Sequence, residues 1–215
     1  MGKYKLVMFD MDGTLIQGRG IFVIAERKGF KDKLTKKIKY DNIDFYQRSI
    51  DIAKLSKGLK KKEILDIFRS IRLSDYVEDV IKELKKHDIK TAIATDSYNL
   101  LADDLRERLG IDYTFANNLI INDGIITGEL EIHNKDLTQD FFSGKIYSIC
   151  KSCALEQLSK KLGININETI AVGDGKVDIG MIKKAGLGIA YNAPEEVQKH
   201  ADIVTNDMRI ILKYI

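Results

Sequence analysis

Short apolar runs alternate with amphipathic stretches along most of this 215-residue chain. An apolar run from Tyr4 to Phe9 has the length of a buried strand and ends at acidic residues. Similar runs predict further strands at Thr91–Ala94, Thr169–Val172, Leu187–Tyr191 and Asp202–Val204. Helical spacing of apolar residues occurs in Val77–His87, Leu100–Leu109, Lys151–Leu162 and Val177–Ala185. Glycine follows the last three of these, as is common where helices end. Strands that alternate with helices predict an α/β fold with a Rossmann-like, doubly wound parallel sheet.

Two segments depart from this alternation. Ile120–Leu130 has the pattern of a β-hairpin, with Asp123 and Gly124 as its turn. Residues 17–74 are helical in pattern throughout and rich in lysine. The pattern therefore divides the chain into a core of residues 1–16 and 75–215 and an inserted helical segment of residues 17–74.

The net charge of +3 conceals an uneven distribution. Residues 17–74 carry 16 Lys and Arg against 7 Asp and Glu, a net charge of +9, so the remaining residues carry −6. The near balance overall argues against a nucleic-acid-binding protein, which usually has a clear basic excess. A basic segment beside an acidic core would instead attract a small anionic substrate. No stretch approaches 18 uncharged apolar residues, so we expect no membrane span.

The two cysteines, Cys150 and Cys153, are too few for a disulfide framework, and we expect a cytoplasmic protein. Their C-x-x-C spacing is compatible with a redox motif. Such a motif would follow the first strand of a βαβ unit, however, whereas this one lies late in the chain. A zinc site would need two further ligands, and the three histidines are scattered singly. We expect two unrelated thiols, with redox chemistry or a disulfide bond as the alternative.

Polar residues follow the predicted strands at the edge where an α/β sheet binds its ligands. Four are carboxylates and one is a hydroxyl, and a lysine begins the helix before one of these strands: Asp10, Asp12, Thr95, Asp174, Asp178 and Lys151.

This set of residues suits phosphoryl chemistry. Asp10 and Asp12 share a face of an extended chain, so they would repel each other unless a cation lay between them. With Asp174 they form an all-oxygen site, which favours Mg²⁺ over zinc. Lys151, the Thr95 hydroxyl and the backbone N–H groups around residues 11–13 could hold phosphate oxygens. One carboxylate would attack phosphorus, and the other would protonate the leaving alkoxide and then activate water.

Two motifs resemble those of a known family. FDMDGTL (Phe9–Leu15) resembles the D-x-D-G-T signature of the haloacid dehalogenase superfamily, and VGDGKVD (Val172–Asp178) resembles its G-D-G-x-x-D motif. Stretches such as LGIDYTFANNLI, GIITGEL and GININETIAVGDGKVDIGMIKKAGLGIAYNA are similar to phosphoserine phosphatases within it. Most members of the superfamily are magnesium-dependent phosphatases. The resemblance thus implies a hydrolase for a small phosphate monoester.

The resemblance also implies a role for each matching residue. Asp10 would be the nucleophile and Asp12 the general acid and base. Magnesium would be bound by the Asp10 side chain, the Asp12 carbonyl and Asp174, with Asp178 orienting that shell. Phosphate would be bound by Thr95 and Lys151, together with the positions of Gly13 and Asp96. Residues 17–74 would form a helical cap over the substrate.

Departures from the phosphoserine phosphatase pattern concern the substrate. The glutamate that pairs with the serine ammonium is replaced by Arg19. The cap arginine that pairs with the serine carboxylate aligns with Ile52, and Arg48 lies one helical turn away as a substitute. Asp96 and Ser97 stand where the family usually has two glycines. The phosphate machinery is therefore matched, whereas the serine-recognition residues are not.

Other functions remain open at this stage. They are a sugar-phosphate phosphatase, a phosphotransferase of the same superfamily and a catalytically idle phosphate-binding module. A phosphoacceptor signalling domain is disfavoured because it needs no cap, and a dehalogenase because it does not need Asp12. The expected partner is a small phosphorylated metabolite, without nucleic acid or membrane, bound by a monomer or homodimer.

Overall fold

A computed structural model describes residues 2–39, 44–140 and 142–215. Its centre is a seven-stranded sheet with the strand order β4-β3-β2-β1-β5-β6-β7. The strands are β1 (Leu6–Phe9), β2 (Lys90–Tyr98), β3 (Tyr113–Asn122), β4 (Ile125–Glu131), β5 (Thr169–Gly173), β6 (Leu187–Tyr191) and β7 (Ile203–Thr205). Neighbouring strands are parallel except β3 and β4, which pair antiparallel at one edge. The expected α/β fold is confirmed, with the hairpin as an antiparallel addition to the parallel sheet.

Helices lie between the strands, as the sequence pattern predicts. They are α1 (Gly20–Arg27), α2 (Lys31–Lys39), α3 (Phe45–Lys54), α4 (Lys61–Arg69), α5 (Val77–Lys86), α6 (Asn99–Leu109), α7 (Lys151–Leu162), α8 (Ile179–Lys184) and α9 (Glu195–Gln198). Short 3₁₀ turns are η1 (Ile166–Glu168), η2 (Lys176–Asp178) and η3 (Met208–Lys213). Gly110 and Gly163 adopt left-handed backbone angles directly after α6 and α7. Both predicted helix ends are therefore confirmed.

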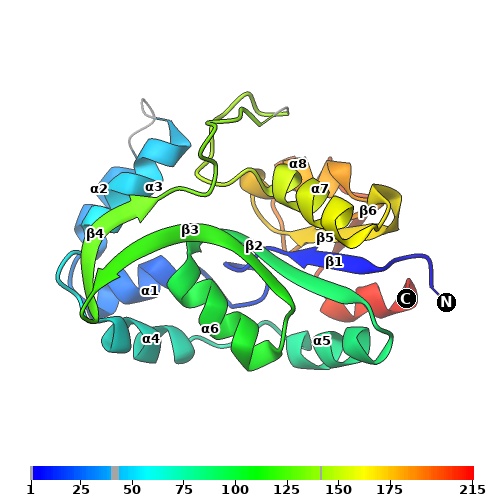
Figure 1. Ribbon diagram of the computed structural model, residues 1–215, viewed down its shortest axis with the longest axis horizontal. Helices are drawn as coiled ribbons and strands as arrows, with labels where there is room; N and C mark the ends of the chain where they lie inside the picture. Colours follow the sequence, from blue (N-terminus) through cyan, green and yellow to red (C-terminus); the bar gives the residue numbers. More distant parts are fainter. Residues whose placement is uncertain (1, 40–43, 141) are drawn as a thin grey trace.

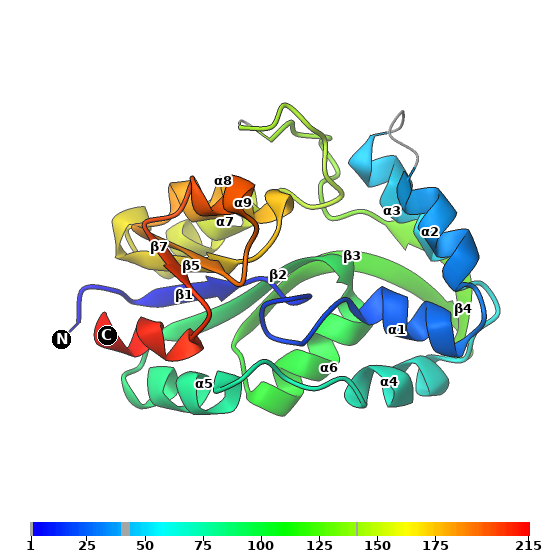
Figure 2. The ribbon, with the colours of Figure 1, turned by 180° about the vertical axis from the view of Figure 1, so that it is seen from behind.

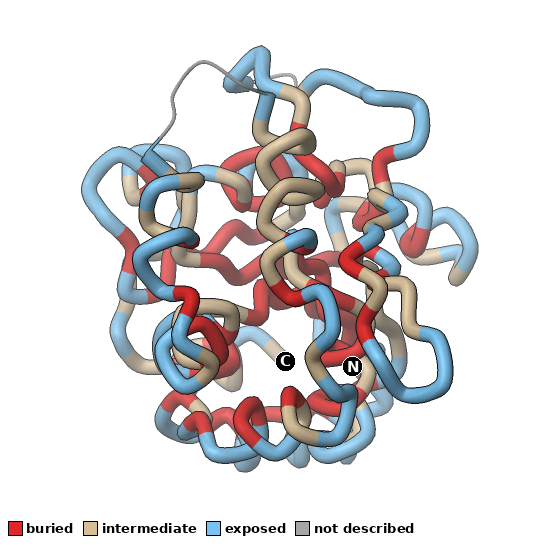
Figure 3. Tube along the Cα trace, turned by 90° about the vertical axis from the view of Figure 1, so that its left-hand side faces the viewer, coloured by how far each residue is buried: buried red, intermediate tan, exposed pale blue. Residues whose placement is uncertain are grey.

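The two faces of the sheet are covered by different helices, as Figures 1 and 2 show. Val7 and Phe9 of β1 belong to a core that includes residues of α5, α6 and η3. Leu6 and Met8 point to the opposite face and join a second core with residues of α7 and α8. All four residues are fully buried, as expected for a strand covered on both faces. Figure 3 shows this inner layer in red, with exposed residues on the loops and outer helix surfaces.

Helices α1–α4 lie between β1 and α5 in the chain and form one end of the molecule, beside the β3–β4 hairpin (Figure 1). Ile24 of α1 and Phe68 of α4 belong to the same hydrophobic cluster as the α5–α6 face of the sheet. Backbone hydrogen bonds also join the hairpin to this segment, from Lys61 to Gly124 and from Ile126 to Leu59. The helical segment thus shares a core with the sheet rather than standing apart from it.

Some expectations about local structure were wrong. Strand β2 continues to Tyr98 with a register shift after Ala94, so it is longer than its apolar run. The helix expected at Val177–Ala185 begins as the 3₁₀ turn η2 and becomes α-helical only at Ile179.

The interpretation of the cysteines also needs correction. Cys150 and Cys153 are not independent thiols but form a disulfide across the first turn of α7, where their Cα atoms lie 5.2 Å apart. This removes the cysteine-based argument for a cytoplasmic location, since such bonds are rare in that compartment. Among the described residues, no helix is both long and apolar enough to cross a membrane.

Candidate active site

The carboxyl ends of β1 and β5 bring the two sequence motifs together. The strands are parallel neighbours, with Phe9 in register with Val172, and the Asp10 N–H donates to the Val172 carbonyl at 2.9 Å. Asp10 and Asp174 therefore follow adjacent strands at the same sheet edge. Among the described residues, Asp10, Asp174 and Asp178 form a cluster in which one oxygen of each lies within 4.8 Å of the others. The predicted convergence of these three carboxylates is observed.

Lys151 is the cation at the centre of this cluster. It is the first residue of α7 and is only 2% exposed. Its Nζ donates to Asp10 Oδ1 at 2.5 Å and to Asp178 Oδ1 at 2.6 Å. Burial alone would lower the pKa of Lys151, but Asp10 and Asp178 raise it well above its ordinary value. Lys151 is thus a fixed positive charge, whereas Lys145, the other lysine nearby in the sequence, is exposed.

Asp178 is held by donors on both of its oxygens. Oδ2 accepts from the backbone N–H groups of Asp174 at 3.1 Å and Gly175 at 2.8 Å, while Oδ1 accepts from Lys151. The carboxylate also packs against Gly173, where a Cβ would lie 2.5 Å from the Asp178 Cβ. A side chain so restrained can fix the loop after β5 and the lysine, but it has little capacity left for a further ligand.

Asp10 and Asp174 are carboxylates that repel each other at short range. They are close enough to share a hydrogen bond. Burial, followed by the charges of Asp178 and Asp174, raises the pKa of Asp10 well above its ordinary value, against the opposing effect of Lys151. Burial and then Asp178 likewise raise the pKa of Asp174. A hard divalent cation would relieve this repulsion, and the all-oxygen donor set fits Mg²⁺.

Gly13 lies directly against this site. Its backbone has a φ of +87°, and a Cβ at this position would collide with the Asp174 carboxylate. Glycine is therefore required on both conformational and steric grounds. The position lets the backbone after β1 approach the carboxylates closely, which is compatible with the phosphate-binding role expected for it.

The Asp12 carboxylate lies outside the three-residue cluster and has a different environment. Its Oδ1 accepts from the backbone N–H of Gly20, the first residue of α1, at 2.5 Å. Burial raises the pKa of Asp12 to about 7; the Gly20 hydrogen bond opposes this shift, and Asp96 adds to it. A carboxyl group that titrates near neutral pH can both donate and accept a proton during turnover. The metal ligand expected at Asp12 is its backbone carbonyl rather than this carboxylate.

A cleft of about 490 Å³ opens over these residues, between the sheet edge and helices α1–α3. Its lining includes Arg19, Arg48 and Asp96 among the residues expected to contact substrate. Thr95 does not line it: this residue is fully buried, and its hydroxyl accepts from the Ser97 N–H at 3.1 Å. The phosphate-binding role expected of the Thr95 hydroxyl therefore stays a prediction.

Sequence reasoning missed part of the cleft wall. Tyr147 and Ser148 line it from the loop before α7, and the Phe45 ring lies 5.0 Å from that of Tyr147. Asn117 of β3 donates to the Ser148 hydroxyl at 2.9 Å and to the Asp96 carbonyl at 2.7 Å. No periodicity marks residues in an irregular loop, so only the tertiary structure shows that they reach the site.

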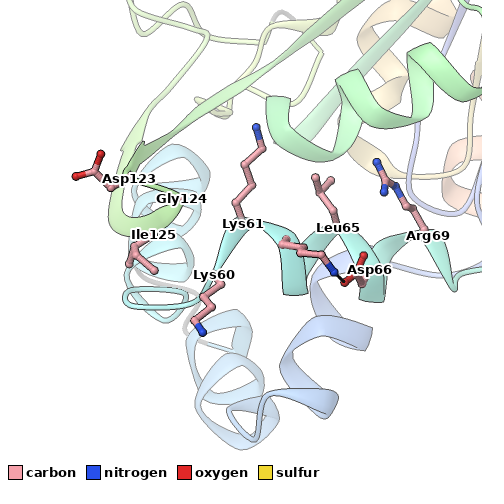
Figure 4. A pocket seen from close by; sticks show the side chains of 9 residues that line it. Lys60, Lys61, Leu65, Asp66, Arg69, Asp123, Gly124 and Ile125 are labelled. Atoms are coloured by element: carbon pink, nitrogen blue, oxygen red, sulfur yellow. Dashed lines mark hydrogen bonds and ion pairs between the residues drawn. The ribbon is translucent and has the colours of Figure 1, made fainter.

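Another hollow of about 490 Å³ lies between α4 and the β3–β4 turn, lined by residues such as Lys60, Lys61, Leu65 and Asp123 (Figure 4). Arg69 at its margin is paired with Asp104 at 2.6 Å. It contains no cluster of carboxylates like that around Asp10 among the described residues. Among the described residues, the carboxylate cluster therefore lies beside the cleft and not in this hollow.

Comparison with known proteins agrees with this geometry. Residues 4–186 match the sequence profile of haloacid dehalogenase-like hydrolases. The chain belongs to this family. It is 36% identical to a phosphoserine phosphatase of Methanocaldococcus jannaschii, over 99% of this chain and 98% of that protein. It is 33% identical to a phosphoserine phosphatase of Archaeoglobus fulgidus over 92% of this chain, which spans about half (55%) of that longer relative.

Solved structures show the same relationship for this hydrolase. A substrate-bound phosphoserine phosphatase complex is 34% identical, with a TM-score of 0.83 over 100% of both chains. A phospho-aspartyl intermediate analogue of phosphoserine phosphatase is 34% identical, with a TM-score of 0.82 over 99% of both chains. The likeness therefore covers the helical segment and the hairpin as well as the sheet.

Proposed function

We propose that this chain is a magnesium-dependent phosphatase that hydrolyses a small phosphate monoester through an aspartyl-phosphate at Asp10. One observation carries the proposal. A carboxylate fixed by a buried lysine lies two residues before a second carboxyl group whose pKa is about 7. This pairing supplies both a nucleophile and an acid–base group for the same reaction.

In the first step, the Asp10 carboxylate attacks phosphorus, and the bond from phosphorus to the ester oxygen breaks. Lys151 holds Asp10 Oδ1 and so orients the other oxygen of the carboxylate. Protonated Asp12 gives its proton to the departing alkoxide, which leaves as the free alcohol. In the second step, ionised Asp12 takes a proton from water as the water oxygen attacks phosphorus. Inorganic phosphate is released and Asp10 is regenerated.

The metal would be held by the Asp10 side chain, the Asp174 side chain and the Asp12 carbonyl, with Asp178 orienting the loop that carries Asp174. Bound there, Mg²⁺ would offset the negative charge of the carboxylates and of the phosphoryl group. The backbone around Gly13, residues Thr95 and Asp96 of β2, and the Lys151 ammonium would surround the phosphate. Residues 17–74 would act as the cap that excludes water from the first step.

Phosphate release from phenyl phosphate with Mg²⁺ tests this proposal. We expect turnover that is lost in EDTA and restored by Mg²⁺. Full activity in the chelator would contradict the metal assignment. Absence of turnover with every monoester tested would leave a phosphate-binding module, and reduced phosphate release in the presence of acceptor alcohols would indicate a phosphotransferase.

A further inference from the structure

The wall of the cleft opposite the carboxylates has an unusual charge composition. Its described lining from residues 17–74 comprises five apolar side chains, one serine and two arginines, and includes no carboxylate. The apolar members include Phe22 and Ile52. The part of a substrate that lies beyond its phosphoryl group would contact this wall.

Arg48 is presented to the cleft on an aromatic support. Its guanidinium carbon lies 4.7 Å from the centre of the Phe45 ring, and that ring packs against Tyr147. A guanidinium stacked on an aromatic face is restricted in orientation and suits a planar anionic group such as a carboxylate. Arg19, just before α1, is the second cation of this wall, and its charge acts on both Asp12 and Asp174. Arg19 therefore lies toward the phosphoryl end of the cleft.

An ammonium group would be poorly placed in such a cleft. Four of the carboxylates that line it are already engaged by Lys151, by the Gly20 N–H or by one another. Asp96 is the remaining carboxylate of the described lining, but it lies near the phosphoryl centre, where its charge acts on Asp12 and Lys151. Two arginines and an apolar surface would face the amine instead, which is unfavourable through repulsion and desolvation.

We propose that the substrate of this cleft is a phosphate monoester whose alcohol part has an apolar body and a second anionic group of the carboxylate type, and no ammonium group. The proposal rests on the proposed phosphatase activity and narrows it to a substrate class. Arg48 binds the second anionic group, the ring pair of Phe45 and Tyr147 contacts the apolar body, and the described residues of the helical wall offer an amine no carboxylate. The cleft volume of about 490 Å³ lies within the range of about 300 to 1,000 Å³ typical of small-molecule sites.

Three aryl phosphates that differ only in their para substituent test this proposal: phenyl phosphate, 4-carboxyphenyl phosphate and 4-(aminomethyl)phenyl phosphate. We expect kcat/KM for the carboxylate to exceed that for the amine by at least about tenfold, which corresponds to roughly 1.4 kcal/mol. O-phosphoserine and 3-phosphoglycerate form a second pair, because they share a carbon skeleton and differ in an ammonium or hydroxyl group. Here we expect the hydroxyl compound to be preferred.

Substitutions of single residues test which side chain causes the preference for a carboxylate over an amine. Arg48→Gln is expected to reduce the carboxylate-to-amine ratio about tenfold or more, whereas Arg48→Lys retains part of it. Arg27→Gln removes the same charge from an exposed position of α1 and is expected to leave the ratio unchanged. Because each ratio is measured within one enzyme, partial loss of folded protein does not affect it.

The outcomes separate this inference from the proposed function. If none of the aryl or alkyl phosphates is hydrolysed, the phosphatase proposal itself fails. If they are hydrolysed and the amines are used as well as the carboxylates or better, the phosphatase proposal stands and the substrate class is wrong. A preference for O-phosphoserine that is lost in Asp96→Asn would show that Asp96 binds the ammonium, and would also overturn the proposed substrate class.

Discussion

The hydrogen bond from Gly20 to Asp12 predicts how the pH dependence of the enzyme can be changed without altering a catalytic side chain. The Gly20 N–H donates to Asp12 Oδ1 at 2.5 Å and favours the ionised carboxylate. Gly20 is also the first residue of α1, a position where proline is well tolerated in helices. Gly20→Pro therefore removes the donor while leaving the helix able to form, and because the proline Cδ takes the place of the N–H hydrogen, the Asp12 carboxylate has to move away from it.

The expected shift follows from the strength of that bond. A hydrogen bond to a charged group contributes about 1.5 to 3 kcal/mol, and 1.36 kcal/mol corresponds to one pKa unit. Loss of the Gly20 donor should thus raise the pKa of Asp12 by roughly one to two units from its value of about 7. Gly20→Ala is the matched control because it keeps the N–H, and its Cβ would meet Asp12 Oδ1 and the Phe68 ring at 3.4 Å.

The assay is the pH profile of kcat/KM for phenyl phosphate at saturating Mg²⁺. Asp12 must be protonated when the alkoxide leaves, so kcat/KM falls as the pH rises through the pKa of Asp12. We expect this alkaline limb to move to higher pH by roughly one to two units in Gly20→Pro and to stay in place in Gly20→Ala. An alkaline limb that is the same in wild type and Gly20→Pro, or that moves equally in both variants, would refute the assignment of Asp12 as the acid.

Three further predictions concern the carboxylates and the disulfide. Asp10→Asn should reduce kcat at least about 10⁴-fold with an unchanged circular dichroism spectrum, and near wild-type turnover would exclude Asp10 as nucleophile. Asp12→Asn should raise the free energy of unfolding of the metal-free protein by up to about 4 kcal/mol at pH 8, because the raised pKa of Asp12 opposes folding once the pH exceeds its unfolded value. This gain should vanish below pH 4 in urea titrations, and a gain that is equal at both pH values would contradict it. Reduction of the Cys150–Cys153 bond should lower the free energy of unfolding by roughly 2 kcal/mol, and Cys153→Ser should show the lower value with no response to reductant.

Much of the fold was predictable because local and tertiary preferences agree. The run at β1 is apolar at every position, as a strand buried on both faces must be, and Leu6 and Phe9 do face different cores. The turn at Asp123 and Gly124 was predictable because a tight hairpin turn needs positive φ angles, which an Asp-Gly pair tolerates well. The two residues have φ angles of +48° and +76°. The extension of β2 to Tyr98 was not, because polar residues interrupt the apolar run after Ala94 and pairing with β3 resumes only at Tyr98, opposite Asn117.

The candidate site also has a part that the sequence predicts and a part that it does not. The convergence of Asp10 and Asp174 follows from the parallel pairing of β1 and β5, which the alternation of strands and helices already indicates. The contributions of Tyr147 and Ser148 depend on how an irregular loop folds back over the sheet edge. The disulfide was underestimated although the predicted helix at Lys151–Leu162 already brings both cysteines to its first turn, where the Cys153 N–H donates to Cys150 Sγ.

Residues of both the helical segment and the core determine the pKa of Asp12. Gly20 and Arg19, at the start of the helical segment, lower the pKa of Asp12, whereas burial and Asp96 of the core raise it. Any movement of α1 away from the sheet edge would therefore lengthen the bond from Gly20 and admit water around the carboxylate at the same time. The first change raises the pKa and the second lowers it, so they oppose each other. Burial is the largest of these effects, so the net result of such a movement is a lower pKa for Asp12, and a segment close to the core favours the protonated form that donates in the first step.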